Sequence, residues 1–433
     1  MKNSNQFKTT LFMATTLATV LLALALVFLF VKHARQSREF NAFRDNIEER
    51  EKKSRILSEV PHGAVRLDEK RNRIVGRVED YEFVYTVDPR LQNMAEEALR
   101  AFGEKHNLGS EEYAGSIVGV DASTGAVKVM ASYESRRAEF FAASPWSGLL
   151  DPMARNSAFP MASIQKIVTA AAGVGMGVTT PETVEVCRGA MHVGGRTIAS
   201  FTGSTSGKMS LGQAMATSCN TIFAQIALDL SRDKLEDTYR KFMFNRRLEF
   251  DLPVAESVFT VPDEKYSLAE AGSGLGGARV SPLHVALVSA AVQNKGVMMR
   301  PYLVDRIERG KEVIRKAEPA PLSEPMTKDT ADKVALLMEG TIEQGGTGYN
   351  GFGKPMLDQG LRRNVPAKTG TVYGACKSLK VTWFVGFVAD GEPDIAFAVL
   401  LTNRVGVNLH ATELAWDFFE TVFHDKKIQK HDR

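Results

Sequence analysis

The segment AFPMASIQKIVTAAAG, residues 158–173, holds the pair of side chains around which the rest of the chain is organised. From Ala162 onward the residues predict a helix with an apolar face, and residues three apart lie on the same face of a helix. Ser163 and Lys166 can therefore touch without help from any other part of the fold. A serine hydroxyl becomes a nucleophile when a neighbouring base takes its proton, and a buried lysine of lowered pKa is such a base. Because Ser-x-x-Lys is common by chance, the local alternative is a surface hydroxyl beside a surface amine.

The composition is that of an ordinary globular protein and excludes some functions. The chain has 433 residues, 44% of them hydrophobic and 24% charged, with a net charge of +3. This length leaves room for one large domain or two ordinary ones. The charge is mild and no basic stripe is interleaved with aromatic residues, so no nucleic acid is expected as a partner. Cys187, Cys219 and Cys376 form no metal-ligand cluster, and spacing alone does not decide whether one pair forms a disulfide.

Residues 9–31 carry no charge and predict a transmembrane anchor. The run is long enough to cross a hydrocarbon core about 30 Å thick. It ends abruptly at Lys32 without a small-residue cleavage site, which favours an anchor over a cleaved signal peptide. Residues 1–8 are then a short tail, and residues 32–84 a charged stalk followed by a small hairpin that turns at residues 68–73. The flanking lysines and arginines leave the orientation open, because large domains translocate regardless of such local charge.

The remainder, residues 85–425, predicts one α+β domain with an antiparallel sheet flanked by helices and a helical subdomain. A first helix opens with Asp88 as N-cap and Pro89 at its first position. The following elements are read from hydrophobic period and turn residues: a β-hairpin at 115–132, a mostly helical middle at 163–241 with a loop-like interruption at 187–209, three strands at 364–372, 381–390 and 394–403, and a closing helix at 411–425.

Two further polar signals lie in these elements. Ser218 and Asn220 form a polar break between two helical runs, where a helix cap is the simplest structural role. The sequence Lys368-Thr369-Gly370-Thr371 lies in the first of the three late strands. A glycine inside a strand often marks a place where another group approaches the backbone closely. The local alternative is a strand-end bulge beside a solvated lysine.

A formal G-x-G-x-x-G occurs at Gly272, Gly274 and Gly277. No strand precedes it, and Ser281-Pro282 rather than the glycines opens the next helix. A dinucleotide site needs the opposite context. We therefore expect a glycine-rich turn before a core helix.

In chain order, Ser163-x-x-Lys166, Ser218-x-Asn220 and Lys368-Thr369-Gly370 resemble the active-site motifs of penicillin-binding proteins and serine β-lactamases. The lead-in RNSAFPMASIQK, the segment GGARVSPLHVALVSAAVQNKG, and KTGTV followed by WFVGF also resemble that family. The resemblance covers residues 85–425 and is to the monofunctional, class B-like transpeptidase domain. One departure is Met161-Ala162 before Ser163, where the family often has Pro-Gly.

The resemblance implies a role for each matched residue. Ser163 would attack the carbonyl of a D-Ala-D-Ala bond, and Lys166, kept neutral by burial and nearby positive charge, would take its proton. Ser218 would relay a proton to the leaving amine. Asn220 would hold Lys166 and the substrate backbone. Lys368 would supply positive charge for the terminal carboxylate, with the Thr369 and Thr371 hydroxyls assisting, and Gly370 would belong to the same substrate-binding strand. The backbone N–H groups of Ser163 and Thr371 would form the oxyanion hole. No metal or other cofactor is implied.

The function implied is a membrane-anchored D,D-transpeptidase that cross-links peptidoglycan stem peptides and is inhibited by β-lactams. Its catalytic domain would lie on the periplasmic side of the cytoplasmic membrane. The implied partners are a glycosyltransferase or other wall-synthesis proteins, because no glycosyltransferase domain is recognised in the chain and the stretch after the predicted anchor is short. The alternatives are a D,D-carboxypeptidase, a β-lactamase, and a non-catalytic scaffold or penicillin sensor.

Overall fold

The computed structural model describes residues 65–108, 113–139, 146, 149–151, 153–200, 207–376, 379–390 and 393–425. The expected tail, membrane anchor and charged stalk fall within residues 1–64, outside the described residues. In the part that is described, no helix is both long and apolar enough to cross a bilayer.

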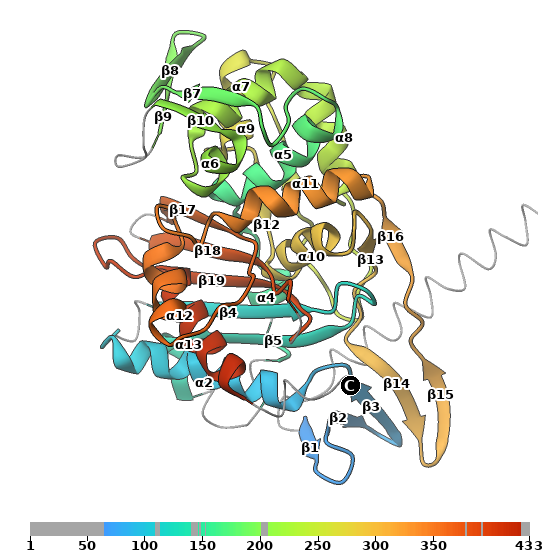
Figure 1. The fold of residues 1–433 in the computed structure, drawn as a ribbon. Helices are drawn as coiled ribbons and strands as arrows, with labels where there is room; N and C mark the ends of the chain where they lie inside the picture. Colours follow the sequence, from blue (N-terminus) through green and yellow to red (C-terminus); the bar gives the residue numbers. More distant parts are fainter. Residues whose placement is uncertain are drawn as a thin grey trace, which may run out of the picture. The chain divides into compact units, whose positions relative to one another are not determined.

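A central five-stranded sheet forms the middle of the domain, in the order β17-β18-β19-β4-β5 (Figure 1). Every neighbouring pair is antiparallel. The predicted hairpin at 115–132 and the three predicted late strands are confirmed, since β-branched and aromatic residues fill these strands. The strand bounds are β4 (Tyr113–Val120), β5 (Val127–Glu134), β17 (Ala367–Cys376), β18 (Leu379–Phe387) and β19 (Ala396–Arg404).

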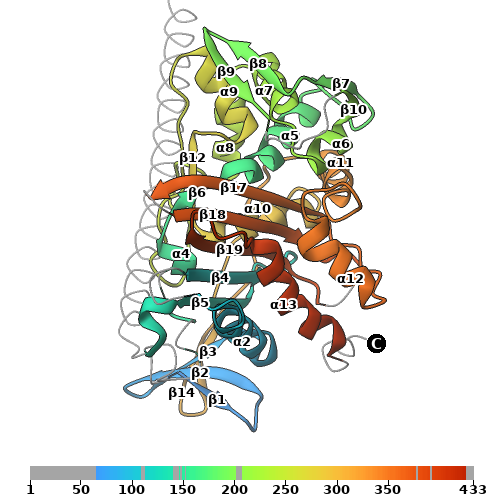
Figure 2. The same ribbon diagram turned by 90° about the vertical axis from the view of Figure 1, so that its left-hand side faces the viewer.

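Helices cover both faces of this sheet (Figure 2). On one face lie α2 (Pro89–Lys105) and the predicted closing helix α13 (Ala411–His424). The Asp88 side chain caps α2 as predicted, accepting hydrogen bonds from the N–H groups of Arg90 and Leu91. The other face is covered by α10 (Pro282–Gln293), which is buried nearly throughout its length because both sides of it meet protein. The sheet is therefore held rigidly between two apolar layers.

A helical subdomain lies beside strand β17, as expected (Figure 1). The helix expected from Ala162 begins as one turn of 3₁₀ helix, η3, before α5. The bounds are η3 (Ala162–Gln165), α5 (Lys166–Gly175), α6 (Leu211–Ala216), α7 (Asn220–Leu230), α8 (Arg232–Lys241), α9 (Lys265–Ser273) and α11 (Lys328–Glu339).

The interpretation of residues 187–209 as a loop is wrong for its described part. Strands β7 (Val184–Cys187) and β10 (Gly207–Ser210) pair with each other, and β8 (Ala190–Val193) pairs with β9 (Arg196–Ala199). Gly194 and Gly195 close the β8–β9 hairpin with φ values of 56° and 76°. Such positive φ angles suit the tight turns that match strand twist, so the glycines close a hairpin here instead of marking a loop. A disulfide joins Cys187 to Cys219.

A second sheet, ordered β1-β2-β3-β14-β15, combines the predicted small hairpin with a segment more than 200 residues later. Asp68 pairs with Arg73, which confirms the predicted turn, and β3 then pairs with β14. The bounds are β1 (Arg66–Asp68), β2 (Arg73–Val78), β3 (Tyr81–Tyr85), β14 (Val304–Arg309) and β15 (Glu312–Lys316). The short remaining elements are η2 (Ser135–Arg137), α4 (Met153–Asn156), β6 (Phe159–Pro160), β11 (Val258–Phe259), β12 (Ala278–Val280), β13 (Met298–Met299), β16 (Pro321–Ser323), η4 (Tyr349–Gly353) and α12 (Lys354–Asp358).

Candidate active site

The predicted contact between Ser163 and Lys166 is present. Ser163 lies in η3, and the Lys166 Nζ at the start of α5 is 2.9 Å from the Ser163 Oγ. Ser163 is partly exposed, whereas Lys166 is fully buried. The alternative of a surface hydroxyl beside a surface amine is therefore wrong.

Lys166 has two further hydrogen-bond partners, and both can only accept. Its Nζ donates to the Asn220 Oδ1 at 2.8 Å and to the Ser273 carbonyl oxygen. A neutral amine has two N–H groups and one lone pair. With both N–H groups given to these oxygens, the lone pair faces the third neighbour, the Ser163 hydroxyl, which can donate. The arrangement suits a base that accepts the serine proton.

Burial lowers the pKa of Lys166 well below its usual range, and the charge of Lys368 lowers it further. Both effects disfavour the ammonium form, the first through lost hydration and the second through repulsion. Lys166 is therefore neutral at a pH where an exposed lysine is charged.

Asn220 is oriented by a backbone carbonyl rather than used as a helix cap. Its Nδ2 donates to the Ala199 oxygen at 2.7 Å, which turns its Oδ1 toward Lys166. Helix α7 begins at Asn220 with Cys219 as N-cap and no side-chain capping bond, so the helix-cap interpretation is wrong. The Cys187–Cys219 disulfide ties the residue between Ser218 and Asn220 to the end of β7.

Lys368 is the second buried lysine of the site. Its Nζ donates to the Ser218 Oγ at 3.0 Å and to the Thr369 carbonyl oxygen at 2.9 Å. Burial lowers the pKa of Lys368 to about 7. The interpretation as a solvated lysine is thus wrong, and the ammonium is poised to gain an anionic partner, because an anion would offset part of the cost of burying the charge.

Strand β17 brings Lys368 to the nucleophile because it is the edge strand of the central sheet and packs against η3. A Cβ atom on Gly370 would lie 3.1 Å from the Met161 oxygen and from the Ile164 Cγ2. The close approach predicted at this glycine is confirmed. An edge strand leaves alternate backbone N–H groups without a strand partner, and Thr371 lies in this edge.

The glycine turn at residues 272–277 shapes the site from the other side. Gly274 follows α9 with a φ of +82°, and a Cβ there would lie 2.5 Å from the Ala162 oxygen. The turn is followed by β12 and then α10, which Ser281 caps. The expected turn before a core helix is confirmed. Because Gly274 has no side chain, the turn can also lie close to the backbone of Ala162, the residue before the nucleophile.

Reasoning from the sequence did not identify three groups of the site. The Ala199 and Ser273 carbonyls are backbone atoms and carry no sequence signal. Thr347 carries one, because it lies in the short motif Gly345-Gly346-Thr347-Gly348. Its Oγ1 accepts a hydrogen bond from the Thr369 Oγ1 at 2.6 Å, and its N–H donates to the Ala216 oxygen at 3.0 Å. Thr347 thus links the strand of Lys368 to the segment that carries Ser218.

Taken together, the three motifs meet in one site. Ser163, Lys166 and Asn220 form one hydrogen-bonded group, and Ser218 and Lys368 form another. A nucleophile with a neutral base, a second hydroxyl and a buried cation are the parts needed to take an acyl group from a carboxylate-bearing substrate.

Comparisons with known proteins identify the family. The family model described as "Penicillin binding protein transpeptidase domain" matches residues 115–415. Peptidoglycan D,D-transpeptidase PbpA of Mycolicibacterium smegmatis is 26% identical over 76% of this chain and 68% of its own length. The D,D-transpeptidase domain of a peptidoglycan glycosyltransferase from Eggerthella lenta is 27% identical, with a TM-score of 0.63 over 78% of this chain and 82% of that one.

A further neighbour, penicillin-binding protein A of Mycobacterium tuberculosis as a penicillin G acyl-enzyme complex, has a TM-score of 0.63 at 22% identity, covering 78% of this chain and 79% of that one. At this identity the likeness concerns the fold. The family model spans well over half of the chain and contains all three motifs, and the chain therefore belongs to the penicillin-binding protein transpeptidase domain family.

Proposed function

We propose that this protein is a peptidoglycan D,D-transpeptidase that works through an acyl-enzyme on Ser163. The observation that carries the proposal is the surroundings of Lys166, whose two N–H groups are engaged by the Asn220 Oδ1 and the Ser273 carbonyl. The remaining lone pair faces the Ser163 hydroxyl.

In the first half of the reaction, the Ser163 Oγ attacks the carbonyl carbon of the D-Ala-D-Ala bond as Lys166 takes its proton. The developing oxyanion is held by the backbone N–H groups of Ser163 and Thr371. Removing one such donor typically slows a reaction by about 10²–10³. Lys368, with Thr369 and Thr371, binds the terminal carboxylate. The C–N bond breaks as the Ser218 hydroxyl passes a proton to the leaving amine.

In the second half, an amine of another stem peptide attacks the Ser163 ester. Its proton returns through the same groups to the Ser163 Oγ, an amide forms and the enzyme is released. β-lactams would acylate Ser163 in the same way, since their ring amide and carboxylate stand in for the peptide bond and its terminus.

We further propose that residues 9–31 anchor the chain in the cytoplasmic membrane with the catalytic domain on the periplasmic side. The uncharged length of this segment supports an anchor. The Cys187–Cys219 disulfide supports an extracytoplasmic domain, because disulfides persist in oxidising compartments. A glycosyltransferase that supplies glycan strands is the partner this function calls for.

The test uses a peptide donor ending in D-Ala-D-Ala, with and without an amine-bearing stem peptide. Released D-Ala and the cross-linked product are followed by mass spectrometry, with Ser163→Ala as control. A transpeptidase gives both products, and the variant gives neither. Release of D-Ala without cross-linked product would identify a carboxypeptidase instead, and no release at all would leave a non-catalytic scaffold.

A further inference from the structure

A pocket of about 670 Å³ lies between helices α6 and α11. Two of its lining residues adjoin the site directly. Thr217 precedes Ser218 in the chain, and Gly346 precedes Thr347, which holds the Thr369 hydroxyl. The wall of the pocket is therefore one residue along the chain from Ser218 at one point and from Thr347 at another.

The charged side chains in this pocket are free to bind a ligand. Lys208 comes from β10, Glu339 from the end of α11, and Glu343 from the loop that follows. Throughout the described residues, no hydrogen bond or ion pair engages these three side chains. Lys208 and Glu343 are exposed, and Glu339 is partly exposed. A pocket with one free cation and two free carboxylates suits a zwitterionic ligand.

We propose that this pocket binds the acceptor, a peptide that carries both an amine and carboxylates. The proposal rests on the proposed function and names the second substrate of the same site. Attack of an amine on the acyl-enzyme is the reverse of amine departure, so the attacking and leaving nitrogens occupy the same position beside Ser218. The acceptor must then extend from that position into open space, and the pocket begins at Thr217.

The chemical step balances without any further reactant. The carboxylates of Glu339 and Glu343 concentrate the cationic acceptor, which gives one proton to the solvent before its neutral form reacts. The amine nitrogen bonds to the carbonyl carbon and the ester C–Oγ bond of Ser163 breaks. The amine proton passes to the Ser163 Oγ by way of Ser218 and Lys166. An amide and free enzyme result.

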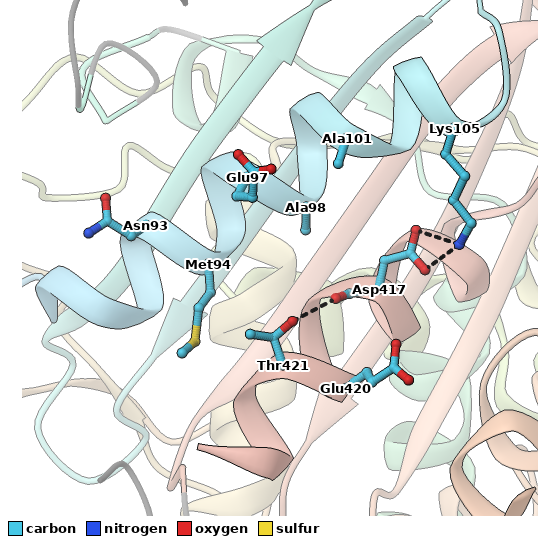
Figure 3. Close-up of a pocket in the computed structure, with 9 residues that line it drawn as sticks. All are labelled: Asn93, Met94, Glu97, Ala98, Ala101, Lys105, Asp417, Glu420 and Thr421. Atoms are coloured by element: carbon cyan, nitrogen blue, oxygen red, sulfur yellow. Dashed lines mark hydrogen bonds and ion pairs between the residues drawn. The ribbon is translucent and has the colours of Figure 1, made fainter. Parts of the chain in front are cut away.

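A second pocket of the described domain does not fit this role. It measures about 470 Å³ and lies between α2 and α13 (Figure 3). Its Lys105 is already paired with Asp417 at 2.8 Å, as the figure shows. None of its lining residues adjoins one of the three motifs, so an amine bound there has no path to the ester.

The test measures how the acyl-enzyme divides between water and amine. The full-length protein is given the D-Ala-D-Ala donor and increasing concentrations of an amine-bearing stem peptide, and the ratio of cross-linked to hydrolysed product is recorded. Because both products come from one acyl-enzyme, this ratio does not depend on how much protein is folded or acylated. Variants Glu339→Gln and Glu343→Gln remove the charges singly and together, and Glu324→Gln, an exposed glutamate elsewhere, is the control.

We expect each single variant to lower the ratio by about two- to fivefold, as for loss of one exposed ionic contact. The double variant should lower it further, and the control should leave it unchanged. An unchanged ratio in the double variant would overturn this proposal while leaving the proposed function intact. A parent protein that forms no acyl-enzyme would instead overturn the proposed function, and this proposal with it.

Discussion

At the scale of single residues, two buried lysines have different roles because they have different neighbours. Lys166 donates to the Asn220 and Ser273 oxygens, and in its neutral form it has a lone pair left for the Ser163 hydroxyl 2.9 Å away. Lys368 donates to the Ser218 hydroxyl and to its neighbour's carbonyl, with a pKa of about 7. One lysine is thus suited to take a proton and the other to bind an anion.

Replacing Asn220 with aspartate should change the protonation of Lys166. A carboxylate 2.8 Å from the Nζ favours the charged form, so the pKa of Lys166 should rise. In Asn220→Asp, the acid limb of the pH profile for penicillin acylation should move up by about one to three pH units, the range expected for a close opposite charge. Asn220→Ala is the control, because it removes the acceptor without adding charge. Equal acid limbs in the two variants would contradict this account of Lys166.

The pKa of Lys368 predicts an alkaline limit to acylation. Lys368 is charged below about pH 7 and neutral above it, and only the charged form attracts the carboxylate of a penicillin. The second-order rate constant should therefore fall as pH rises above 7, by up to tenfold per unit, because this constant reports the free enzyme. Stopped-flow acylation between pH 5 and 9 measures it. A rate constant that stays level to pH 9 would show that the charge on Lys368 is not needed.

Some contacts between single residues of the site were predictable from the sequence, and others were not. The Ser163–Lys166 contact was predictable because it depends on the period of one helix. The contact between Ser218 and Lys368 was not predictable, because these residues lie 150 positions apart in the chain. They meet only when the edge strand of the sheet packs against the helices. Their motifs suggested the contact by resemblance to a family, whereas local reasoning left a helix cap as an equal alternative at Ser218 and Asn220 and favoured a solvated lysine at Lys368.

At the scale of elements, glycines set how closely the segments around the nucleophile approach one another. Gly370 lets β17 approach η3, and Gly274 lets the turn after α9 approach Ala162. Ala162 and Ser218 both hold left-handed φ angles, 53° and 58°. Such strain in non-glycine residues persists only where the surrounding structure enforces it, and here Ala162 precedes the nucleophile while Ser218 is itself a residue of the site.

A glycine pair separates close approach from backbone freedom. Gly274 and Gly310 both have positive φ, but a Cβ on Gly310 would meet nothing within 4 Å. Gly310→Ala should therefore lower the free energy of unfolding by about 1–2 kcal/mol, the cost of a left-handed angle, and leave acylation unchanged. Gly274→Ala should cost more and slow acylation, because the Ala162 oxygen must move. Thermal unfolding and penicillin labelling measure both, and equal behaviour of the two variants would contradict a role for the close approach.

Helices and strands were predicted correctly where the periodicity of hydrophobic residues is strong, and incorrectly where glycines are frequent. The late strands and the closing helix α13 are rich in large apolar residues, and their bounds were predicted within a few residues. Residues 187–209 were read as a loop from their Gly, Ser and Thr content. The strands there are only four residues long, too short to show an alternating pattern, and the Cys187–Cys219 disulfide connects them to the site without any signal in spacing.

Across the described domain, the small sheet joins the first described strands to a strand from much later in the chain. Strand β3 pairs with β14, and Phe83, Val84 and Tyr85 are buried there. The sequence suggested the hairpin but could not show its partner, because pairing across more than 200 residues leaves no local pattern.

This pairing predicts that the first strands are needed for stability. A chain beginning at residue 86 would lose β1 to β3 and expose the edge of β14, whereas one beginning at residue 59 keeps the whole compact unit. Loss of six buried hydrophobic side chains, each contributing about 1.5–3 kcal/mol, should lower the melting temperature and promote association through the open edge. Calorimetry and light scattering of the two chains measure this. Equal melting temperatures would show that the small sheet is an independent appendage.

We propose Ser163 as the nucleophile, and locating a penicillin adduct on the chain tests this role directly. The full-length protein and its Ser163→Ala variant are incubated with a fluorescent penicillin, digested and examined by mass spectrometry. We expect a stable adduct on the peptide that contains Ser163, and no such adduct in the Ser163→Ala variant. An adduct on another residue, the same labelling in Ser163→Ala, or no adduct in the parent protein would contradict it.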